Sequence, residues 1–161
     1  MVRTSDQRAS ITLRRIFAGF RRVDKKVMSI FAWKPEYTLG HAEIDHQHKK
    51  LFQLAEELHG AMVAGKGKEV LAPTLSNLIA YTQEHFASEE RLMQAGKYPD
   101  YARHKADHDA LSARVLGFQK EFEANRTALT IGLLHFLKDW LAHHIGETDR
   151  KVAQYFKSKA A

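Results

Sequence analysis

The sequence predicts an all-α protein, folded as an antiparallel up-down-up-down four-helix bundle with a basic N-terminal extension. Four long segments repeat apolar residues at intervals of three, four and seven positions, which is the pattern of an amphipathic helix. The connections between these segments are short, and short loops join helices that run antiparallel. The chain has 161 residues, of which 44% are hydrophobic, so it can bury one sizeable core.

The four helices are expected at about residues 43–64, 68–94, 99–123 and 127–156. Gly65 and Gly67 follow the first helix and Gly96 ends the second, because glycine is common just beyond a helix C-terminus. Pro99 opens the third helix, where the missing N–H of proline is not needed. The expected inward faces are formed by Ile44, Leu51, Ala55, Leu58 and Met62, by Leu71, Leu75, Leu78, Ile79, Phe86 and Leu92, by Leu111, Val115, Phe118 and Phe122, and by Leu134, Leu137, Leu141, Ile145, Val152 and Tyr155.

The amino-acid composition restricts the kinds of metal site that the chain can build. It contains no cysteine, which excludes disulfides, zinc–thiolate sites and iron–sulfur clusters. It contains ten histidines, a high count that needs an explanation. Any metal ion must therefore be held by histidine, aspartate or glutamate.

The positive net charge is concentrated in the first 30 residues. Residues 1–30 hold eight of the 25 Lys and Arg residues but two of the 19 Asp and Glu residues, so the charges of the remaining chain balance. Nucleic acid is therefore not expected as a partner of the bundle. We divide the chain into a basic amphipathic extension, residues 1–30, and a helical bundle, residues 31–161.

The extension has two interpretations. Its apolar residues recur near helical spacing between Arg and Lys residues, and a basic amphipathic helix can lie on an anionic membrane surface or on a partner protein. The alternative is a tail without function, or a chain whose translation starts at Met28. No stretch is apolar enough to cross a membrane, and charged residues interrupt the place where an export signal needs its apolar run, so a cytoplasmic location is expected.

Polar residues continue the apolar faces of all four predicted helices. A polar side chain on an inward face is costly unless it is paired or binds a ligand. The same feature on four helices therefore predicts a buried polar site. The residues are His48 in the first helix, His85 and Glu89 in the second, His104 and His108 in the third, and His144 in the fourth.

These side chains are expected at one height along the bundle. His48 and His85 lie almost equally far from the first connecting turn. His144 likewise lies about as far from the last turn as His104 and His108 do. In an antiparallel bundle, equal distances from the connecting turn mean equal heights. His104 and His108 are also four residues apart, which places them on one helix face.

The number of donors indicates more than one metal ion. Imidazoles with carboxylates nearby suit iron, zinc, copper or nickel. A single zinc ion would need only three or four of these ligands. The surplus, together with carboxylates that can bridge, predicts two metal ions and leaves their identity open.

Four motifs resemble the hemerythrin signature. They are Asp45-His46-Gln47-His48-Lys49, His85-x-x-x-Glu89, His104-x-x-x-His108 and Trp140-Leu141-Ala142-His143-His144-Ile145-x-x-x-Asp149. The lead-in Trp33-Lys34-Pro35-Glu36-Tyr37-x-x-Gly40 is similar to that of the bacterial branch, the bacteriohemerythrins. The resemblance covers about residues 31–157. It implies a protein, not an enzyme, that binds dioxygen reversibly at a non-haem di-iron centre for oxygen storage, delivery or sensing.

The resemblance also implies how the two irons (Fe2+/Fe3+) are held. The three histidines of the last two helices would bind one iron, and the two histidines of the first two helices would bind the other. Two carboxylates would bridge both ions, and an oxo or hydroxo group would complete the bridge. The second iron would keep a position for dioxygen. The implied metal ligands are His48, His85, Glu89, His104, His108, His144 and Asp149.

The spacing of His144 and Asp149 makes a specific structural prediction. Five residues along an ideal α-helix correspond to a rotation of about 140°, so the two side chains would not share a face. Both can reach the centre if the helix is locally widened, as in a π-bulge, and such bulges are frequent at functional sites.

Two other functions stay open. One is a di-iron oxidoreductase that acts on nitric oxide, peroxide or dioxygen, and the other is an iron-handling or regulatory module that docks through residues 1–30. Gly146 modestly favours the enzyme, because the resemblance implies a leucine-like residue beside the dioxygen pocket at this position and glycine would open it. Trp140 and Ile145 are expected in an apolar shell that keeps out water and anions.

The remaining polar residues are expected away from the metals. His143 and Glu147 would form a solvated pair four residues apart. Surface positions, or positions behind the ligands, are expected for His41, His46, His59 and His135, and a solvated helix face for Glu56, Glu57 and Glu90.

Overall fold

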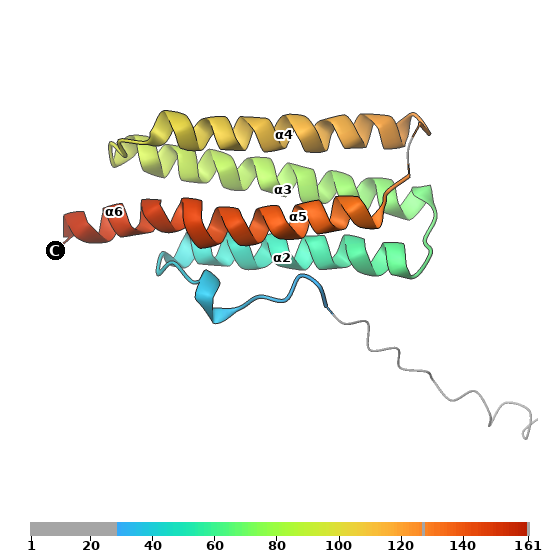
Figure 1. Ribbon diagram of the computed structural model, residues 1–161, viewed down its shortest axis with the longest axis horizontal. Helices are drawn as coiled ribbons and strands as arrows, with labels where there is room; N and C mark the ends of the chain where they lie inside the picture. Colours follow the sequence, from blue (N-terminus) through green and yellow to red (C-terminus); the bar gives the residue numbers. More distant parts are fainter. Residues whose placement is uncertain (1–28, 127, 161) are drawn as a thin grey trace, which may run out of the picture.

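The computed structural model describes residues 29–126 and 128–160. Within these residues it contains helices and no β-strand, and the predicted all-α bundle is confirmed (Figure 1). Three of the four long segments are single α-helices, and the fourth changes from α to π to α without a break. The segments are α2 (Ala42–Val63), α3 (Lys68–Ala95), α4 (Tyr101–Glu123), and α5 (Ile131–His143) followed by the π-helix η3 (His144–Asp149) and α6 (Arg150–Ala160).

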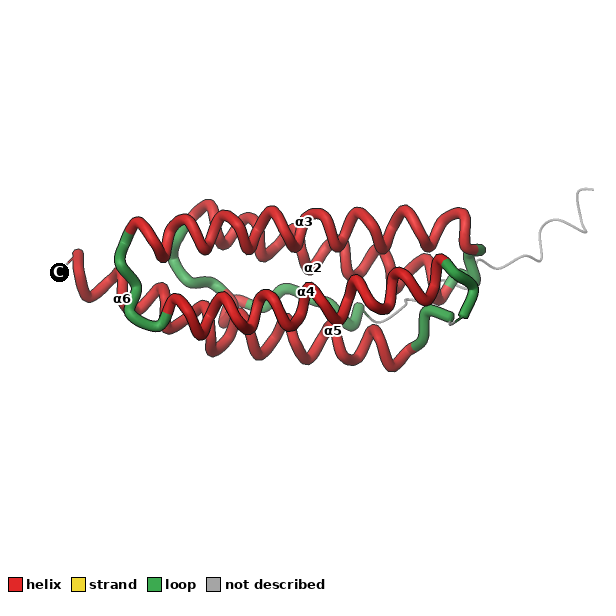
Figure 2. Tube along the Cα trace, turned by 90° about the horizontal axis from the view of Figure 1, so that it is seen from above, coloured by secondary structure: helices red, strands yellow, loops and turns green. Residues whose placement is uncertain are grey.

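Successive segments run antiparallel (Figure 1). Seen from above, the connections between the helices lie at the two ends of the bundle (Figure 2). Each of the first three helices ends with a residue of positive φ just beyond its C-cap: Gly65 at 63°, Lys97 at 54° and Asn125 at 56°. The Lys66 N–H donates a hydrogen bond to the Ala61 carbonyl oxygen, and equivalent backbone bonds form at the other two turns. These bonds satisfy carbonyl groups that have no partner within the helix.

Gly96 ends α3 for a different reason from the one expected. Gly96 keeps a right-handed conformation, with φ −81°, and Lys97 is the residue that adopts the left-handed conformation. A Cβ atom at position 96 would overlap the ring of Phe156 on α6. Gly96 is therefore needed for close packing between helices, and not for the backbone conformation of the turn.

Two helices begin later than predicted. Pro99 lies in the turn before α4, because Asp100 is the N-cap and Tyr101 the first helical residue. The last segment begins at Ile131, where the Thr130 hydroxyl oxygen accepts a hydrogen bond of 3.3 Å from the Leu133 N–H. Threonine satisfies an N–H group that the first helical turn cannot pair.

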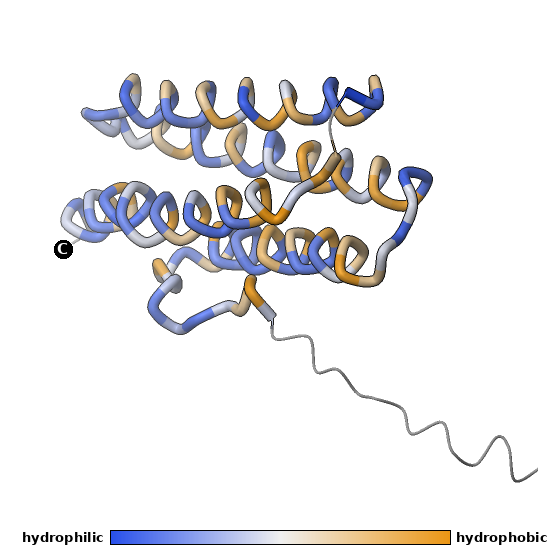
Figure 3. The backbone as a smooth tube through the Cα atoms, turned by 45° about the vertical axis from the view of Figure 1, so that its right-hand side comes forward, coloured by the Kyte–Doolittle hydropathy of each residue, from blue (hydrophilic) through white to orange (hydrophobic). Residues whose placement is uncertain are grey.

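The apolar core has two parts along the bundle. The larger cluster extends from the layer of the polar site toward the α2–α3 turn, and a smaller one, around Met93, Tyr98 and Val152, lies toward the α3–α4 turn. Hydrophobic and hydrophilic segments alternate along each helix (Figure 3). The buried residues on the predicted inward faces are Ile44, Leu51, Ala55, Leu58, Leu75, Leu78, Ile79, Phe86, Leu111, Val115, Phe122, Leu134, Leu137, Leu141, Ile145 and Val152.

Residues 29–41, which we call the arm, precede α2 and include the short helix η2 (Pro35–Tyr37). Asp45 on α2 holds the end of the arm. Its carboxylate accepts hydrogen bonds from the N–H groups of Leu39, at 2.7 Å, and Gly40, at 2.9 Å. Two charge-assisted bonds from consecutive amides fix where the chain enters the bundle.

Glu56 on α2 holds the start of the arm. Its carboxylate accepts a hydrogen bond of 3.1 Å from the Phe31 N–H and lies 3.1 Å from Nδ1 of His59. Burial would raise the pKa of Glu56, but the bonds from His59 and Phe31 outweigh it and lower the pKa. Glu56 is half-buried and not fully solvated as expected, and His59 is buried at 6% exposure away from the metal layer.

No helix among the described residues is long and apolar enough to span a membrane. The predicted extension lies outside the described residues, apart from Ser29 and Ile30. Its amphipathic helix, its boundary at residue 30, and its membrane or protein partner therefore stay predictions.

Candidate metal centre

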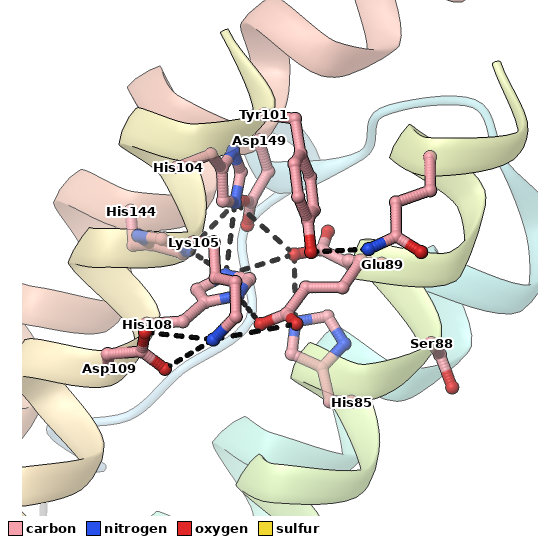
Figure 4. Close-up of polar contacts among 12 residues, drawn as sticks. His85, Ser88, Glu89, Tyr101, His104, Lys105, His108, Asp109, His144 and Asp149 are labelled. Carbon is pink, nitrogen blue, oxygen red and sulfur yellow. Dashed lines mark hydrogen bonds and ion pairs between the residues drawn. The ribbon is translucent and has the colours of Figure 1, made fainter. Parts of the chain in front are cut away.

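Seven polar side chains from all four helical segments meet in one layer, and Figure 4 labels most of them. None is more than 3% exposed. The predicted equal height is confirmed, because the donor atoms form two groups, each within 4.8 Å. The residues are those that the motifs predicted: His48, His85, Glu89, His104, His108, His144 and Asp149.

The first group contains three imidazoles, His104, His108 and His144, which we call the three-histidine group. The Nε2 atom of His108 lies 3.0 Å from Nε2 of His104 and 3.0 Å from Nε2 of His144. Two ligand atoms at right angles, each about 2.1 Å from one ion, are separated by about 3.0 Å. The imidazoles are therefore arranged as adjacent ligands of one metal ion would be.

The second group contains two imidazoles, His48 and His85, which we call the two-histidine group. Their ring centroids are 4.7 Å apart and their planes are inclined by 72°. The Nε2 atom of His48 lies 3.2 Å from Oδ2 of Asp149, and Nε2 of His85 lies 3.7 Å from Oε2 of Glu89. This group therefore faces the same carboxylates from the α2–α3 side of the bundle.

Glu89 and Asp149 belong to both donor groups. Asp149 directs Oδ1 toward His144, at 3.1 Å, and Oδ2 toward His48, at 3.2 Å. Glu89 directs Oε2 toward His108, at 3.5 Å, and Oε1 toward His48, at 3.8 Å. Carboxylates with oxygens turned to both groups can bridge two neighbouring cations.

The hydrogen bonding of the layer is incomplete without a cation. Among the described residues, every buried side-chain nitrogen or oxygen that lacks a hydrogen-bond partner belongs to this cluster, and both oxygens of Asp149 are among them. Each such atom costs about 1–3 kcal/mol when it is left unpaired. Bound metal ions would satisfy the carboxylate oxygens and the Nε2 atoms, so the residues present fit such ions.

The charges of the layer also suit cations. Burial lowers the pKa of His85 to about 4, so its imidazole is neutral at pH 7, as a metal ligand must be. Burial and the charge of Asp149 would raise the pKa of Glu89, but the nearby imidazoles of His85, His104 and His108 outweigh them and hold it at about 2. Burial lowers the pKa of His104, but the nearby carboxylates of Asp149, at 3.3 Å, and Glu89, at 3.6 Å, outweigh it and raise the pKa to about 9. A metal ion must therefore displace a proton from His104.

The predicted widening of the last helix is confirmed. Residues His144–Asp149 form a π-helix, which contains the whole interval between the two candidate ligands. This local change of pitch turns His144 and Asp149 toward the same layer, where Nε2 and Oδ1 are 3.1 Å apart. The spacing of five residues is therefore accommodated by the backbone.

A family model for the hemerythrin HHE cation binding domain matches residues 39–156. The chain belongs to the hemerythrin family. Bacteriohemerythrin of Methylococcus capsulatus is 35% identical over 124 residues, covering 76% of this chain and 94% of that protein. Hemerythrin-like protein of Naegleria gruberi is 30% identical over 125 residues, covering 78% of this chain and 92% of that protein.

Solved hemerythrin structures share the bundle. The crystal structure of a wild-type hemerythrin has a TM-score of 0.72 and 34% identity, covering 76% of this chain and 95% of that chain. A variant in which one leucine is replaced by alanine has a TM-score of 0.74 and 32% identity, covering 80% of this chain and 98% of that chain. At these identities the likeness extends to the sequence as well as to the fold.

Two side chains stand behind the candidate ligands of this hemerythrin domain. The Nδ1 atom of His85 lies 3.0 Å from Oε1 of Gln47, and Nδ1 of His108 lies 3.1 Å from Oε1 of Glu90. An acceptor at Nδ1 fixes the ring orientation and leaves Nε2 free to bind a metal ion. The expectation that Glu90 lies on a solvated face is therefore wrong.

The positions of Gln47 and Glu90 follow a pattern in the sequence that could have indicated their role. Gln47 and His85 lie equally far from Lys66 in the middle of the α2–α3 turn. Glu90 and His108 are related in the same way across the α3–α4 turn. The height argument that grouped the candidate ligands therefore also applies to the residues behind them, but it does not say which of those side chains turn inward.

Aromatic rings cover the three-histidine group. Phe86 stacks on His108, with ring centroids 3.8 Å apart and planes inclined by 6°. Trp140 stacks on His144 at 4.7 Å and 20°. Trp140 therefore lies in the apolar shell, as predicted, and Ile145 is 1% exposed. Phe86 was expected in the core but not in the site.

An apolar cavity of about 20 Å³ lies one helical turn from the layer, on the side of the α2–α3 turn, and is large enough for one molecule of the size of water. Gly146 does not line it, and a Cβ atom there would have no atom within 4 Å outside its immediate backbone. The expectation that Gly146 opens the dioxygen pocket stays a prediction. The wall includes Leu51, Ala55, Leu78, Thr82, Leu111 and Leu141.

The other polar residues lie outside the layer. His143 pairs with Glu147 at 3.2 Å on the surface, with 67% and 65% of their side chains exposed, as predicted. His41 caps α2 by accepting a hydrogen bond of 3.4 Å from the Ile44 N–H. His46, Glu57 and His135 are exposed.

Proposed function

We propose that this protein binds dioxygen reversibly at a pair of iron ions, for oxygen storage, delivery or sensing, and that it does not turn over a substrate. The observation that carries the proposal is that both donor groups contain the same two carboxylates, Glu89 and Asp149. Shared carboxylates hold two cations side by side. Two adjacent ferrous ions can supply the electrons that one dioxygen molecule accepts on binding and returns on release.

The donor groups support different roles for the two ions. The three-histidine group with both carboxylates provides donors from five residues, and the two-histidine group with the same carboxylates provides donors from four. We assign dioxygen to the ion of the two-histidine group, because that ion has fewer protein ligands. The roles of the seven residues as iron ligands belong to this proposal.

The side chains around the layer favour the binding of small, uncharged ligands. The cavity beside the layer is lined mainly by apolar side chains, and such a wall disfavours ions more than a small apolar molecule. The rings of Phe86 and Trp140 cover two of the imidazoles. These residues limit the access of water and anions to the layer, which supports reversible binding.

The buried carboxylates and imidazoles agree better with an oxygen carrier than with an enzyme. Among the described residues, the buried carboxylates and imidazoles outside the seven are those of Asp45 and His59. Asp45 accepts hydrogen bonds from the arm, and His59 pairs with Glu56. Neither lies in the layer as a general acid or base.

The test is anaerobic loading with ferrous iron, followed by metal quantification and optical spectra through cycles of oxygenation. We expect two irons per chain and charge-transfer bands that appear with dioxygen and vanish on its removal. A matched pair of neighbouring histidines controls the experiment. His144→Ala should lose iron, whereas His143→Ala, at the surface, should keep two irons.

Other outcomes would contradict the proposal. Two irons that oxidise once and do not return would indicate a di-iron oxidoreductase. Fewer than two irons in the parent protein would reject the paired centre. Equal iron contents in the His143 and His144 variants would reject the assignment of the ligands.

A further inference from the structure

Arg150 connects the π-helix to the arm. Its Nε donates a hydrogen bond of 2.9 Å to the carbonyl oxygen of Gly146, within the π-helix. A second nitrogen of the same guanidinium donates to the carbonyl oxygen of Glu36, in the arm. One planar side chain therefore binds two backbone carbonyls that are far apart in the sequence.

The bond to Gly146 falls where the helix changes its register. In a regular α-helix, the backbone N–H of residue 150 bonds to the carbonyl of residue 146. The π-helix His144–Asp149 interrupts this pattern. In the π-helix, the Arg150 side chain donates to the Gly146 carbonyl. In an α-helix, the backbone N–H of the same residue would donate to it.

The arm reaches the same carboxylates from the other side. Leu39 and Gly40 line a cavity of about 210 Å³ whose lining also includes Glu89 and Asp149. Leu39 is 4% exposed, and its N–H is fixed by Asp45 at 2.7 Å. The arm therefore forms part of the wall around the shared carboxylates.

We propose that Arg150 is a positioning residue that holds the π-helix in the register that Asp149 needs, and that it couples this register to the seating of the arm. The inference rests on the proposed function, because it takes Asp149 as a ligand shared by two metal ions. A return to α-helical pitch would rotate Asp149 away from His144 and remove one donor from both groups. Arg150 and the arm oppose that return together.

The first experiment compares Arg150→Met with Lys151→Met in the full chain. Both changes remove one cation from neighbouring positions, but Lys151 is exposed. Cobalt(II) replaces iron as the probe, and its release to a chelator is followed optically. We expect release to be about 10- to 100-fold faster for Arg150→Met, which is the usual effect of removing a residue that orients a ligand. Lys151→Met should release cobalt at the parent rate.

Amide hydrogen exchange of the metal-free proteins provides a readout that does not depend on the metal. Exchange at residues 144–150 should be faster in Arg150→Met than in the parent. Arg150→Lys should be intermediate, because an ammonium cannot reproduce the planar fork of the guanidinium. Parent-like exchange and cobalt release in Arg150→Met, with two metals bound by the parent, would overturn the inference and leave the proposed function intact.

The coupling to the arm is tested by Asp45→Asn, which weakens the bonds to Leu39 and Gly40 without touching the layer. We expect faster cobalt release in this variant. The double variant with Arg150→Met should release cobalt at about the rate of Arg150→Met alone, because both changes act on one linkage. Parent-like release in Asp45→Asn, or fully additive effects, would overturn the coupling. A parent that binds fewer than two cobalt ions would reject the proposed function itself.

Discussion

The three-histidine and two-histidine groups share their carboxylates but differ in what surrounds their imidazoles. In the three-histidine group, Phe86 and Trp140 stack on two of the rings, and the carboxylate of Glu90 lies behind His108. In the two-histidine group, the neutral amide of Gln47 lies behind His85. The three-histidine group therefore has the stacked aromatic rings and the anionic acceptor.

This difference shows how one bundle can hold two unequal metal positions. A hydrogen bond to a charged acceptor is roughly twice as strong as one to a neutral acceptor. Glu90 therefore orients His108 more firmly than Gln47 orients His85. We expect the three-histidine position to retain its metal ion more strongly and the two-histidine position to be the more adaptable one.

The largest effect is expected from removing a carboxylate that both groups share. Asp149→Ala takes a donor from each group at once, so we expect metal analysis to find far less than one iron per chain. Glu147→Gln, which changes an exposed carboxylate two residues away, is the matched control and should keep two. One full equivalent of iron in Asp149→Ala would show that the groups do not depend on a common carboxylate.

Removing one imidazole should separate the two groups. His85→Ala leaves the donors of the three-histidine group intact, so we expect about one iron per chain and no oxygen-dependent bands. His108→Ala removes the donor that Glu90 orients, and we expect it to weaken both sites through the shared carboxylates. Identical iron contents in the two variants would remove the basis for treating the groups as unequal.

A smaller effect is expected from the residues behind the ligands. Glu90→Gln keeps an acceptor of the same shape but removes its charge, so we expect metal affinity in chelator competition to fall about tenfold. Gln47→Leu, which removes the acceptor from His85, should affect only the weaker position. A larger loss of total metal in Gln47→Leu would reverse the proposed order of the groups.

The smallest effect is expected at Gly146, which provides no donor to either group and does not line the apolar cavity. Glycine within a helix costs about 0.5–1 kcal/mol relative to alanine, and a Cβ atom at this position meets no side chain within 4 Å. We therefore expect Gly146→Ala to raise the free energy of unfolding by about this amount in urea titrations. Oxygen affinity should not change if Gly146 lies outside the ligand pocket, and a shift in affinity would support the expectation that Gly146 opens that pocket.

Much of the layer could be predicted because it follows from periodicity. A period of 3.6 residues places His48 and Leu51 on one face, and the position of each turn sets the height of each histidine along the bundle. Once the resemblance to hemerythrins implied that Asp149 is a ligand, its five-residue spacing from His144 also indicated the π-helix. These features depend on positions along a helix, which a sequence states directly.

Contacts between segments were harder to predict because they depend on the rotation of each helix about its own axis. Glu90 looked solvated because nothing in the sequence indicates that its side chain turns toward His108 on the next helix. Gly96 looked like the residue that reverses the chain, but the ring of Phe156 takes the space of its Cβ atom and Lys97 adopts the positive φ. In both cases a neighbour distant in sequence decides the role.

Helix positions, the buried polar layer and the resemblance to hemerythrins therefore follow from the order of residues alone, since each depends on spacing within one segment or on distance from a turn. The partners of His85 and His108, the stacking of Phe86 and the link from Arg150 to the arm were decided by the tertiary structure. They arise only when separate segments pack, because only then do the directions of their side chains become fixed relative to one another.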